Sequence, residues 1–165
     1  MNSISRRAML AGAALAITAS TARAASDLEM ADMVVIFKGS RRLYLYRDGK
    51  PIRRFTIALG WAPEGDKQFE GDGRTPEGTY YIDRLNPNSQ FHLSLGISYP
   101  DPNDRAAAAA AGVDPGGDIF IHGSDGRRPN RRPDDWTAGC IAVTNAEIEE
   151  IWQRVPVGTP IVIQP

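Results

Sequence analysis

Residues 136–147 read WTAGCIAVTNAE and contain three structural signals in succession. The small residues after the tryptophan predict a turn, and the four residues that follow form a short, β-prone run. Thr144 and Glu147 then form a capping box, which predicts the start of a helix that continues through Trp152. This order of turn, strand and helix places Cys140 where a turn enters a short strand.

Strand signals extend in both directions from this stretch. Upstream, three runs predict a meander, with Asp48-Gly49 as the hairpin turn between the second and third. One segment differs, because Asp101, Pro102 and Gly112 suit the cap, first position and end of an alanine-rich helix. An Asn-Pro-Asn-Ser sequence at 86–89 predicts a turn, and residues 60–78 predict a long loop. The predicted strands are 33–37, 43–46, 52–59, 80–82, 91–97, 118–122 and 157–163.

The chain has one cysteine, Cys140, and two histidines, His92 and His122. A lone cysteine in an exported protein indicates a reactive thiol, although a small buried hydrophobic residue is an equally common role. His122 ends a predicted strand, directly before Gly123. An imidazole near a thiol can act as its base, and amides of a glycine-containing turn can stabilise an oxyanion. We therefore predict a Cys140–His122 pair, rather than a merely structural histidine.

The first 24 residues resemble an export signal. Arg6 and Arg7 precede a short, alanine-rich apolar run, and Ala22-Arg23-Ala24 matches a cleavage site. The arginine pair favours the twin-arginine route over general secretion. We expect residues 1–24 to be a signal peptide, 25–31 a flexible lead-in and 32–165 one domain, located in the periplasm or cell envelope.

Composition and charge exclude several classes of function. Removing residues 1–24 takes away three arginines and no acidic residue, leaving 16 basic and 20 acidic residues and a formal charge of −4. This balance does not favour nucleic acid as a partner. The apolar run is too short to span a membrane. One cysteine and two separated histidines do not form a zinc ligand pattern, so we predict no metal and no cofactor.

Several motifs together resemble the L,D-transpeptidase (YkuD-type) family. His122-Gly123, a spacer and Thr137-Ala138-Gly139-Cys140-Ile141 match its central pattern. The segment 75–80 (TPEGTY) resembles a second family motif, and 91–95 (FHLSL) and 135–137 (DWT) resemble one branch. The resemblance covers residues 32–165. Ala142 stands where many members have an arginine, a departure that leaves the reaction less defined than the nucleophile.

The resemblance implies a mainly β fold, a sandwich or partly closed barrel with two or three short helices. It implies that Cys140 attacks a peptidoglycan stem peptide and forms a thioester, with His122 as base and the Gly123 carbonyl behind the imidazole. The amides of Gly139 and Cys140 would hold the oxyanion. It also implies acylation of Cys140 by carbapenem-type compounds.

Other residues are candidates for substrate binding. Thr137 belongs to the central motif. His92 could line the cleft or be a structural histidine, and Trp136 could form a cleft wall or pack in the core. Four arginines in the loop between His122 and Cys140 could meet substrate carboxylates or be solvated: Arg127, Arg128, Arg131 and Arg132.

Three functions remain open at this point. The thioester could pass to an amine, which would form a cell-wall cross-link, or to water, which would make the protein a carboxypeptidase or endopeptidase. A non-catalytic wall-binding module is the third possibility. The sequence predicts neither the acyl acceptor nor the oligomeric state.

Overall fold

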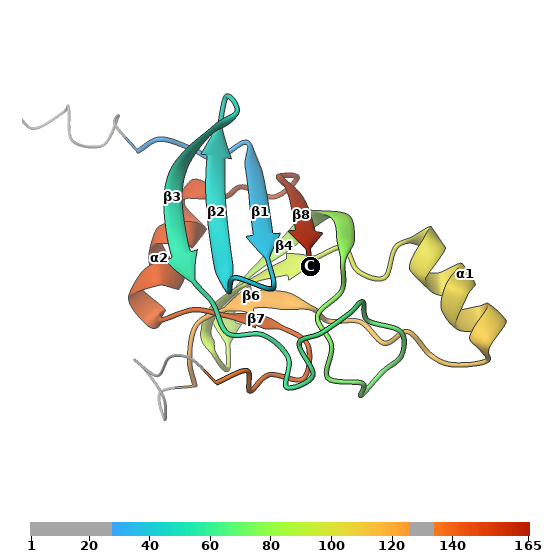
Figure 1. The fold of residues 1–165 in the computed structure, drawn as a ribbon. Helices are drawn as coiled ribbons and strands as arrows, with labels where there is room; N and C mark the ends of the chain where they lie inside the picture. Colours follow the sequence, from blue (N-terminus) through green and yellow to red (C-terminus); the bar gives the residue numbers. More distant parts are fainter. Residues whose placement is uncertain (1–27, 126–133) are drawn as a thin grey trace, which may run out of the picture.

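A computed structural model of the protein describes residues 28–125 and 134–165. These residues form eight strands and two helices, and the backbone is mainly β (Figure 1). The elements in chain order are β1 (Met33–Phe37), β2 (Arg42–Arg47), β3 (Lys50–Thr56), β4 (Gly78–Ser89), β5 (His92–Ile97), α1 (Pro102–Ala111), β6 (Phe120–His122), β7 (Ile141–Ala142), α2 (Asn145–Arg154) and β8 (Pro160–Gln164).

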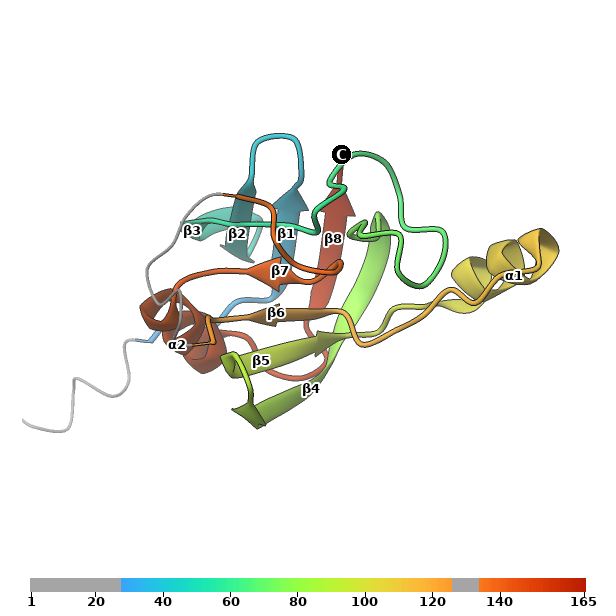
Figure 2. The ribbon, with the colours of Figure 1, turned by 90° about the horizontal axis from the view of Figure 1, so that it is seen from below.

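The strands form one mixed sheet in the order β3-β2-β1-β8-β4-β5-β6-β7. The first three strands are the predicted antiparallel meander, and β8 adds to β1 in parallel. The long strand β4 pairs with β8 through its first half and with β5 through its second half. It curves from one half of the sheet to the other (Figure 2), so the two halves face each other across a common core.

Alternating side chains build that core. In β2, Leu43 and Leu45 are fully buried while the tyrosines between and after them are only partly buried. Strand β8 repeats the pattern with Ile161 and Ile163. This period of two is the one that places one face of each strand against the core. Helix α2 covers β5 and β6 and buries Ile148.

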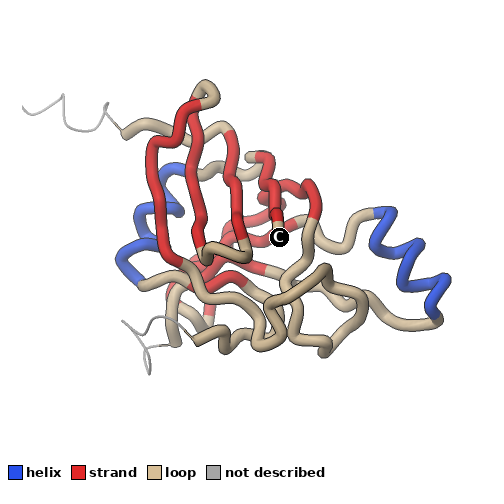
Figure 3. The backbone as a smooth tube through the Cα atoms, viewed as in Figure 1, coloured by secondary structure: helices blue, strands red, loops and turns tan. Residues whose placement is uncertain are grey.

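The sheet does not close into a barrel. Beyond β3, the chain reaches the free edge of β7 but forms only isolated bridges there, Ala58 with Ala142 of β7 and Gly60 with Thr137 of the preceding turn. Ala58 and Ala142 exchange both backbone hydrogen bonds, at 2.9 and 2.8 Å. The predicted mainly β fold with short helices is confirmed, with an open eight-stranded sheet. Much of the irregular backbone gathers at the end of the sheet where β3 meets β7 (Figure 3).

Both predicted helices and their caps are present. Asp101 caps α1 by accepting from the Asn103 and Asp104 amides, and Gly112 ends it in the left-handed conformation. Thr144 and Glu147 form the predicted capping box of α2. Helix α1 projects from the body of the domain (Figures 1 and 2). None of the helices within residues 28–125 and 134–165 is long and apolar enough to cross a bilayer.

The predicted turn at 86–89 is wrong. Strand β4 continues through Ser89, and the chain reverses at residues 90–91. Asn86 pairs with Ser94, and Ser89 pairs with His92, with a register irregularity between the two pairs. Such an irregularity accommodates a proline within a strand, so pairing with β5 overrides the local turn propensity. Residues 1–24, predicted as a signal peptide, lie outside the described residues.

Candidate functional site

His122 is held by strand pairing on both sides. It is the last residue of β6, where it pairs with Ser94 of β5 and Ala142 of β7. Its carbonyl accepts from the Val143 amide at 2.9 Å. The apolar run before His122 forms strand β6, which ends at this histidine. Gly123 follows at a crowded position, because a Cβ there would lie 2.6 Å from the Asn145 side chain.

The imidazole of His122 is buried and its orientation is fixed. Nδ1 lies 2.7 Å from the Gly123 carbonyl oxygen, so Nδ1 carries the proton and Nε2 is left as an acceptor. The ring packs 4.5 Å from Phe91 and 5.7 Å from Trp136, measured between ring centroids. Burial lowers the pKa of His122, an effect that the Gly123 hydrogen bond opposes in part. The ring is therefore neutral at neutral pH and suited to accept a proton.

Cys140 is the last residue of a tight turn, residues 137–140, that hydrogen bonds of the Thr137 hydroxyl stabilise. This hydroxyl donates to the Cys140 carbonyl at 2.6 Å and accepts from the Gly139 amide at 3.1 Å. Thr137 itself is buried, and its amide and carbonyl bond to Leu59 and Trp61. Thr137 therefore holds the turn in shape, and the Gly139 amide, predicted as an oxyanion donor, is already engaged by this hydroxyl.

Asp135 fixes the start of the same turn to the other half of the sheet. Its carboxylate accepts from the Arg41 guanidinium at 2.6–3.1 Å and from the Leu59 amide at 2.8 Å. Arg41 lies 94 positions away in the sequence, in the turn between β1 and β2. In the sequence, Asp135 stands out only as part of a branch motif, because no local signal identifies so distant a partner.

Gly139 is required sterically beside the thiol. Its φ is +137°, and a Cβ there would lie 2.7 Å from the Arg74 carbonyl oxygen. We expect Gly139→Ala to displace the Cys140 backbone and to lower turnover about 10²-fold, the effect of misplacing a reacting group by roughly 1 Å. Turnover and the thermal midpoint of the purified variant are the measurements.

Gly158→Ala is the matched control for this prediction. Gly158 also has positive φ, +92°, but a Cβ there would meet nothing within 4 Å. Both variants should lose stability by roughly 1–3 kcal/mol from backbone strain. Only Gly139→Ala should lose activity as well, and equal activity in the two variants would contradict the steric role.

The Cys140 thiol is half-buried and opens to a pocket of about 390 Å³. Its Sγ contacts the Asp118 carbonyl oxygen at 3.5 Å. Burial raises the pKa of the Cys140 thiol and the Asp118 charge adds to this, while a hydrogen bond with the Phe120 backbone and, more weakly, the Lys67 ammonium oppose it. The thiol is therefore protonated at neutral pH. The pocket is lined by Asn86, Asn88, Ser89, Gln90, Phe91, Ser94, Asp118, Phe120, His122 and Cys140.

A second pocket of about 250 Å³ also reaches Cys140. It lies toward the long loop between β3 and β4, and its lining includes Lys67, Glu70 and Ala138. Asp118 is the other residue that borders both pockets. The sulfur thus lies at the meeting point of two spaces formed by different segments of the chain. Neither Asp118 nor Lys67 was predicted as a site residue from the sequence.

The remaining candidates lie in different places. His92 is exposed, its Nε2 contacts Glu149 Oε1 on α2 at 2.7 Å, and it is not part of the lining of the 390 Å³ and 250 Å³ pockets formed by the described residues. This position favours the structural role. Trp136 packs on the His122 ring and on Phe91, and so supports the imidazole. The arginines of the loop between His122 and Cys140 lie outside the described residues.

Residues 28–125 and 134–165 contain no group of three or more His, Cys, Asp or Glu residues that could hold a metal ion.

The fold and the site define a mainly β protein with a thiol and a buried neutral imidazole at one pocket. The YkuD family, described as the L,D-transpeptidase catalytic domain, matches residues 31–163, and the chain belongs to this family. The chain is 32% identical over 133 residues to YafK of Escherichia coli (strain K12), which is provisionally named an L,D-transpeptidase. The match covers 74% of this chain and 46% of YafK, so the chain spans about half the length of that relative.

Solved structures show the same fold. Pgp2 of Campylobacter jejuni, a helical cell shape determining protein, is 30% identical with a TM-score of 0.63, and the match covers 79% of this chain and 46% of Pgp2. An L,D-transpeptidase from Mycobacterium smegmatis has a TM-score of 0.55 at 14% identity, covering 81% of this chain and 58% of that one. At that identity the likeness concerns the fold alone.

Proposed function

We propose that the protein is an L,D-transpeptidase that acts on peptidoglycan stem peptides through a Cys140 thioester. Family membership supports a cell-wall enzyme of this type. The meeting of Cys140 and His122 at one pocket supports the assignment of nucleophile and base. The hydrogen bond from Nδ1 of His122 to the Gly123 carbonyl leaves Nε2 free to accept the thiol proton.

In the proposed acylation, the thiol proton passes to Nε2 of His122 as Sγ attacks the peptide carbonyl. The C–N bond to the terminal residue breaks, and the imidazolium gives its proton to the leaving amine. The Gly139 amide is engaged by Thr137, so we assign the oxyanion to the Cys140 amide. In the second step an acceptor amine attacks the thioester, the S–C bond breaks, and the amine proton returns through His122 to the thiolate.

The presence of two pockets at one sulfur favours transfer over trimming by a carboxypeptidase. A transferase must bring an acyl donor and an acceptor to the same atom, whereas a carboxypeptidase needs space for only one peptide and a water molecule. Cys140 borders both the 390 Å³ pocket and the 250 Å³ pocket. We assign the donor to the pocket that contains His122 and the acceptor to the other.

The proposed location is the cell envelope. Residues 1–24 would direct export, residues 25–31 would form a flexible lead-in, and residues 32–165 would work on the wall as one catalytic domain. A wall-directed role agrees with the description of Pgp2 as a cell shape determining protein.

Incubation with purified muropeptides, followed by mass analysis of the products, tests the proposal. We expect cross-linked dimers together with release of the terminal residue of the donor. Shortened or separated stems without dimers would contradict transfer and identify a hydrolase at the same site. No product of either kind, from folded protein, would contradict an enzymatic role on these substrates.

A further inference from the structure

Arg41 is a charged residue in an unfavourable backbone conformation. It lies in the turn between β1 and β2 with a φ of +55°, in the left-handed region that few residues other than glycine and asparagine adopt. Glycine would occupy this position with less strain. The presence of an arginine here therefore points to a task for its side chain.

All three nitrogens of the Arg41 guanidinium bond to groups of the protein. Nε lies 3.0 and 3.1 Å from Oδ1 and Oδ2 of Asp135, and Nη2 lies 2.6 Å from Oδ2. Nη1 donates to the Lys38 carbonyl. The paired side chains are only 29% and 15% exposed, so solvent screens the contact in part. Such a forked contact fixes the Asp135 carboxylate in both distance and direction.

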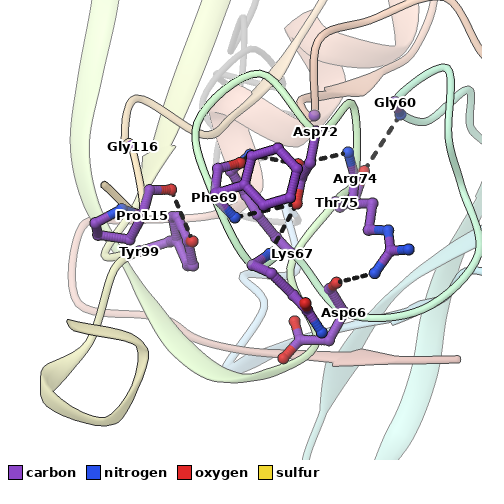
Figure 4. Close-up of polar contacts among 12 residues, drawn as sticks. Gly60, Asp66, Lys67, Phe69, Asp72, Arg74, Thr75, Tyr99, Pro115 and Gly116 are labelled. Atoms are coloured by element: carbon purple, nitrogen blue, oxygen red, sulfur yellow. Dashed lines mark hydrogen bonds and ion pairs between the residues drawn. The ribbon is translucent and has the colours of Figure 1, made fainter. Parts of the chain in front are cut away.

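Asp135 connects this contact to a segment that lies against the turn before Cys140. Its Oδ1 also accepts from the Leu59 amide at 2.8 Å, and the Leu59 carbonyl accepts from the Thr137 amide at 3.1 Å. The next residue, Gly60, is held by the long loop, because its amide donates to the Thr75 hydroxyl at 3.3 Å (Figure 4). The segment is thus fixed on both sides, and Asp135 joins it to Arg41.

The residues after Asp135 carry the constraint to both reacting groups. The Trp136 ring lies 5.7 Å from the His122 ring, measured between centroids. Thr137 then bonds to the carbonyl of Cys140 and holds the turn in shape. A shift of Asp135 would therefore move the support of the base and the support of the nucleophile together.

We propose that Arg41 is a positioning residue for acylation, which through Asp135 keeps the Cys140 thiol within proton-transfer reach of the His122 imidazole. This inference rests on the proposed function and adds a residue that touches neither the substrate nor the reacting atoms. Without the guanidinium, thiol and imidazole are both present but displaced from each other. The step in which the thiol proton moves is then slower.

Arg41→Ala is expected to slow acylation of Cys140 by about 10–10²-fold, up to the effect of displacing a reacting group by roughly 1 Å. The measurement is the rate of carbapenem acylation of folded protein at neutral pH, followed by intact mass. Arg53→Ala is the matched control. Arg53 forms another arginine–carboxylate pair between distant residues, with Glu150 at 2.5 Å, and is not part of the lining of the 390 Å³ and 250 Å³ pockets. Its acylation rate should equal that of the wild type.

A double-mutant cycle separates positioning from a general loss of stability. If Arg41 acts on the geometry between base and nucleophile, its benefit disappears once the base is removed. Arg41→Ala should therefore cost about twofold or less in the His122→Gln background, because the two substitutions remove the same interaction. A role in stability alone would lower the rate by the same factor in both backgrounds.

Methylguanidinium provides a second measurement. Arg41 lines a pocket of about 330 Å³, so the space that Arg41→Ala vacates is open to a small cation. Millimolar methylguanidinium should raise the acylation rate of Arg41→Ala severalfold by pairing with the Asp135 carboxylate. The rate of the Arg41→Ala/Asp135→Asn variant should not respond, because this variant lacks the carboxylate.

The outcomes separate this inference from the proposed function. A wild-type rate in folded Arg41→Ala protein, an equal loss in both backgrounds, or a rescue that does not need the Asp135 carboxylate would overturn the positioning role. If Arg41→Ala does not fold, Arg41→Lys takes its place in the cycle, since lysine keeps the charge but lacks the planar fork. Absence of any acyl-enzyme in the wild type, with carbapenem or with the donor peptide, would instead overturn the proposed function.

Discussion

Cys140→Ala is expected to abolish turnover of a muropeptide donor while leaving the fold intact. Loss of a catalytic nucleophile commonly lowers rates by several orders of magnitude, and here we expect at least about 10³-fold. Stability should change little, because the side chain is only half-buried and its Sγ makes a long contact, 3.5 Å from the Asp118 carbonyl. The measurement is dimer formation by mass spectrometry, alongside the thermal midpoint.

The single cysteine makes this prediction unusually direct. The chain has one thiol, so a covalent adduct with a carbapenem or with the donor peptide can be assigned to Cys140 from the intact mass alone. Cys140→Ser serves as the matched variant, since it keeps a hydroxyl of similar size but a weaker nucleophile. It should retain the fold and lose the adduct on the timescale of wild-type labelling. Dimers formed by folded Cys140→Ala protein would disprove the thioester.

Local sequence patterns were sufficient for most of the fold. The hairpin at Asp48-Gly49, the capped helix after Asp101 and the capping box at Thr144 each depend on neighbours within a few positions, and all three are present. The turn predicted at 86–89 failed for the opposite reason. Its outcome depends on pairing with β5, which the local sequence does not report.

In the candidate site, too, features that depend on neighbouring residues were predictable, and features that depend on distant residues were not. The positions of His122 and Cys140 at the ends of short segments followed from local apolar runs and a glycine-containing turn. The residues that surround His122 and Cys140 could not be predicted in this way, because they come from distant parts of the chain. Phe91 reaches the imidazole from the β4–β5 reversal, and Arg41 holds Asp135 across 94 positions. Lys67 belongs to a loop whose sequence has no periodic pattern, so only the folded chain brings it to Cys140.

The protonation states of the two reacting groups determine how the base is used. Burial raises the pKa of Cys140 and lowers that of His122, so both groups are neutral at rest. A protonated thiol is a poor nucleophile, and the proton must leave as the sulfur attacks. His122 is therefore needed during the attack itself, in contrast to a resting thiolate–imidazolium pair, in which the proton has already moved.

His122→Gln is accordingly expected to slow acylation of Cys140 by about 10²–10⁴-fold at neutral pH, the usual contribution of a general base. The deficit should shrink as the pH rises. Because burial raises the pKa of Cys140, the thiolate fraction increases about tenfold per pH unit through the mildly alkaline range. Hydroxide then removes the proton that His122 removes in the wild type. The measurement is the rate of carbapenem acylation between neutral and alkaline pH, followed by intact mass.

His92→Gln is the matched control, because the chain has two histidines and His92 is exposed against Glu149 on α2. Its acylation rate and pH dependence should equal those of the wild type. A His122→Gln deficit that stays constant across pH would indicate that the ring acts by position and packing against Phe91 and Trp136. A normal rate at neutral pH in folded His122→Gln protein would show that another group accepts the thiol proton, and the base assignment would be wrong.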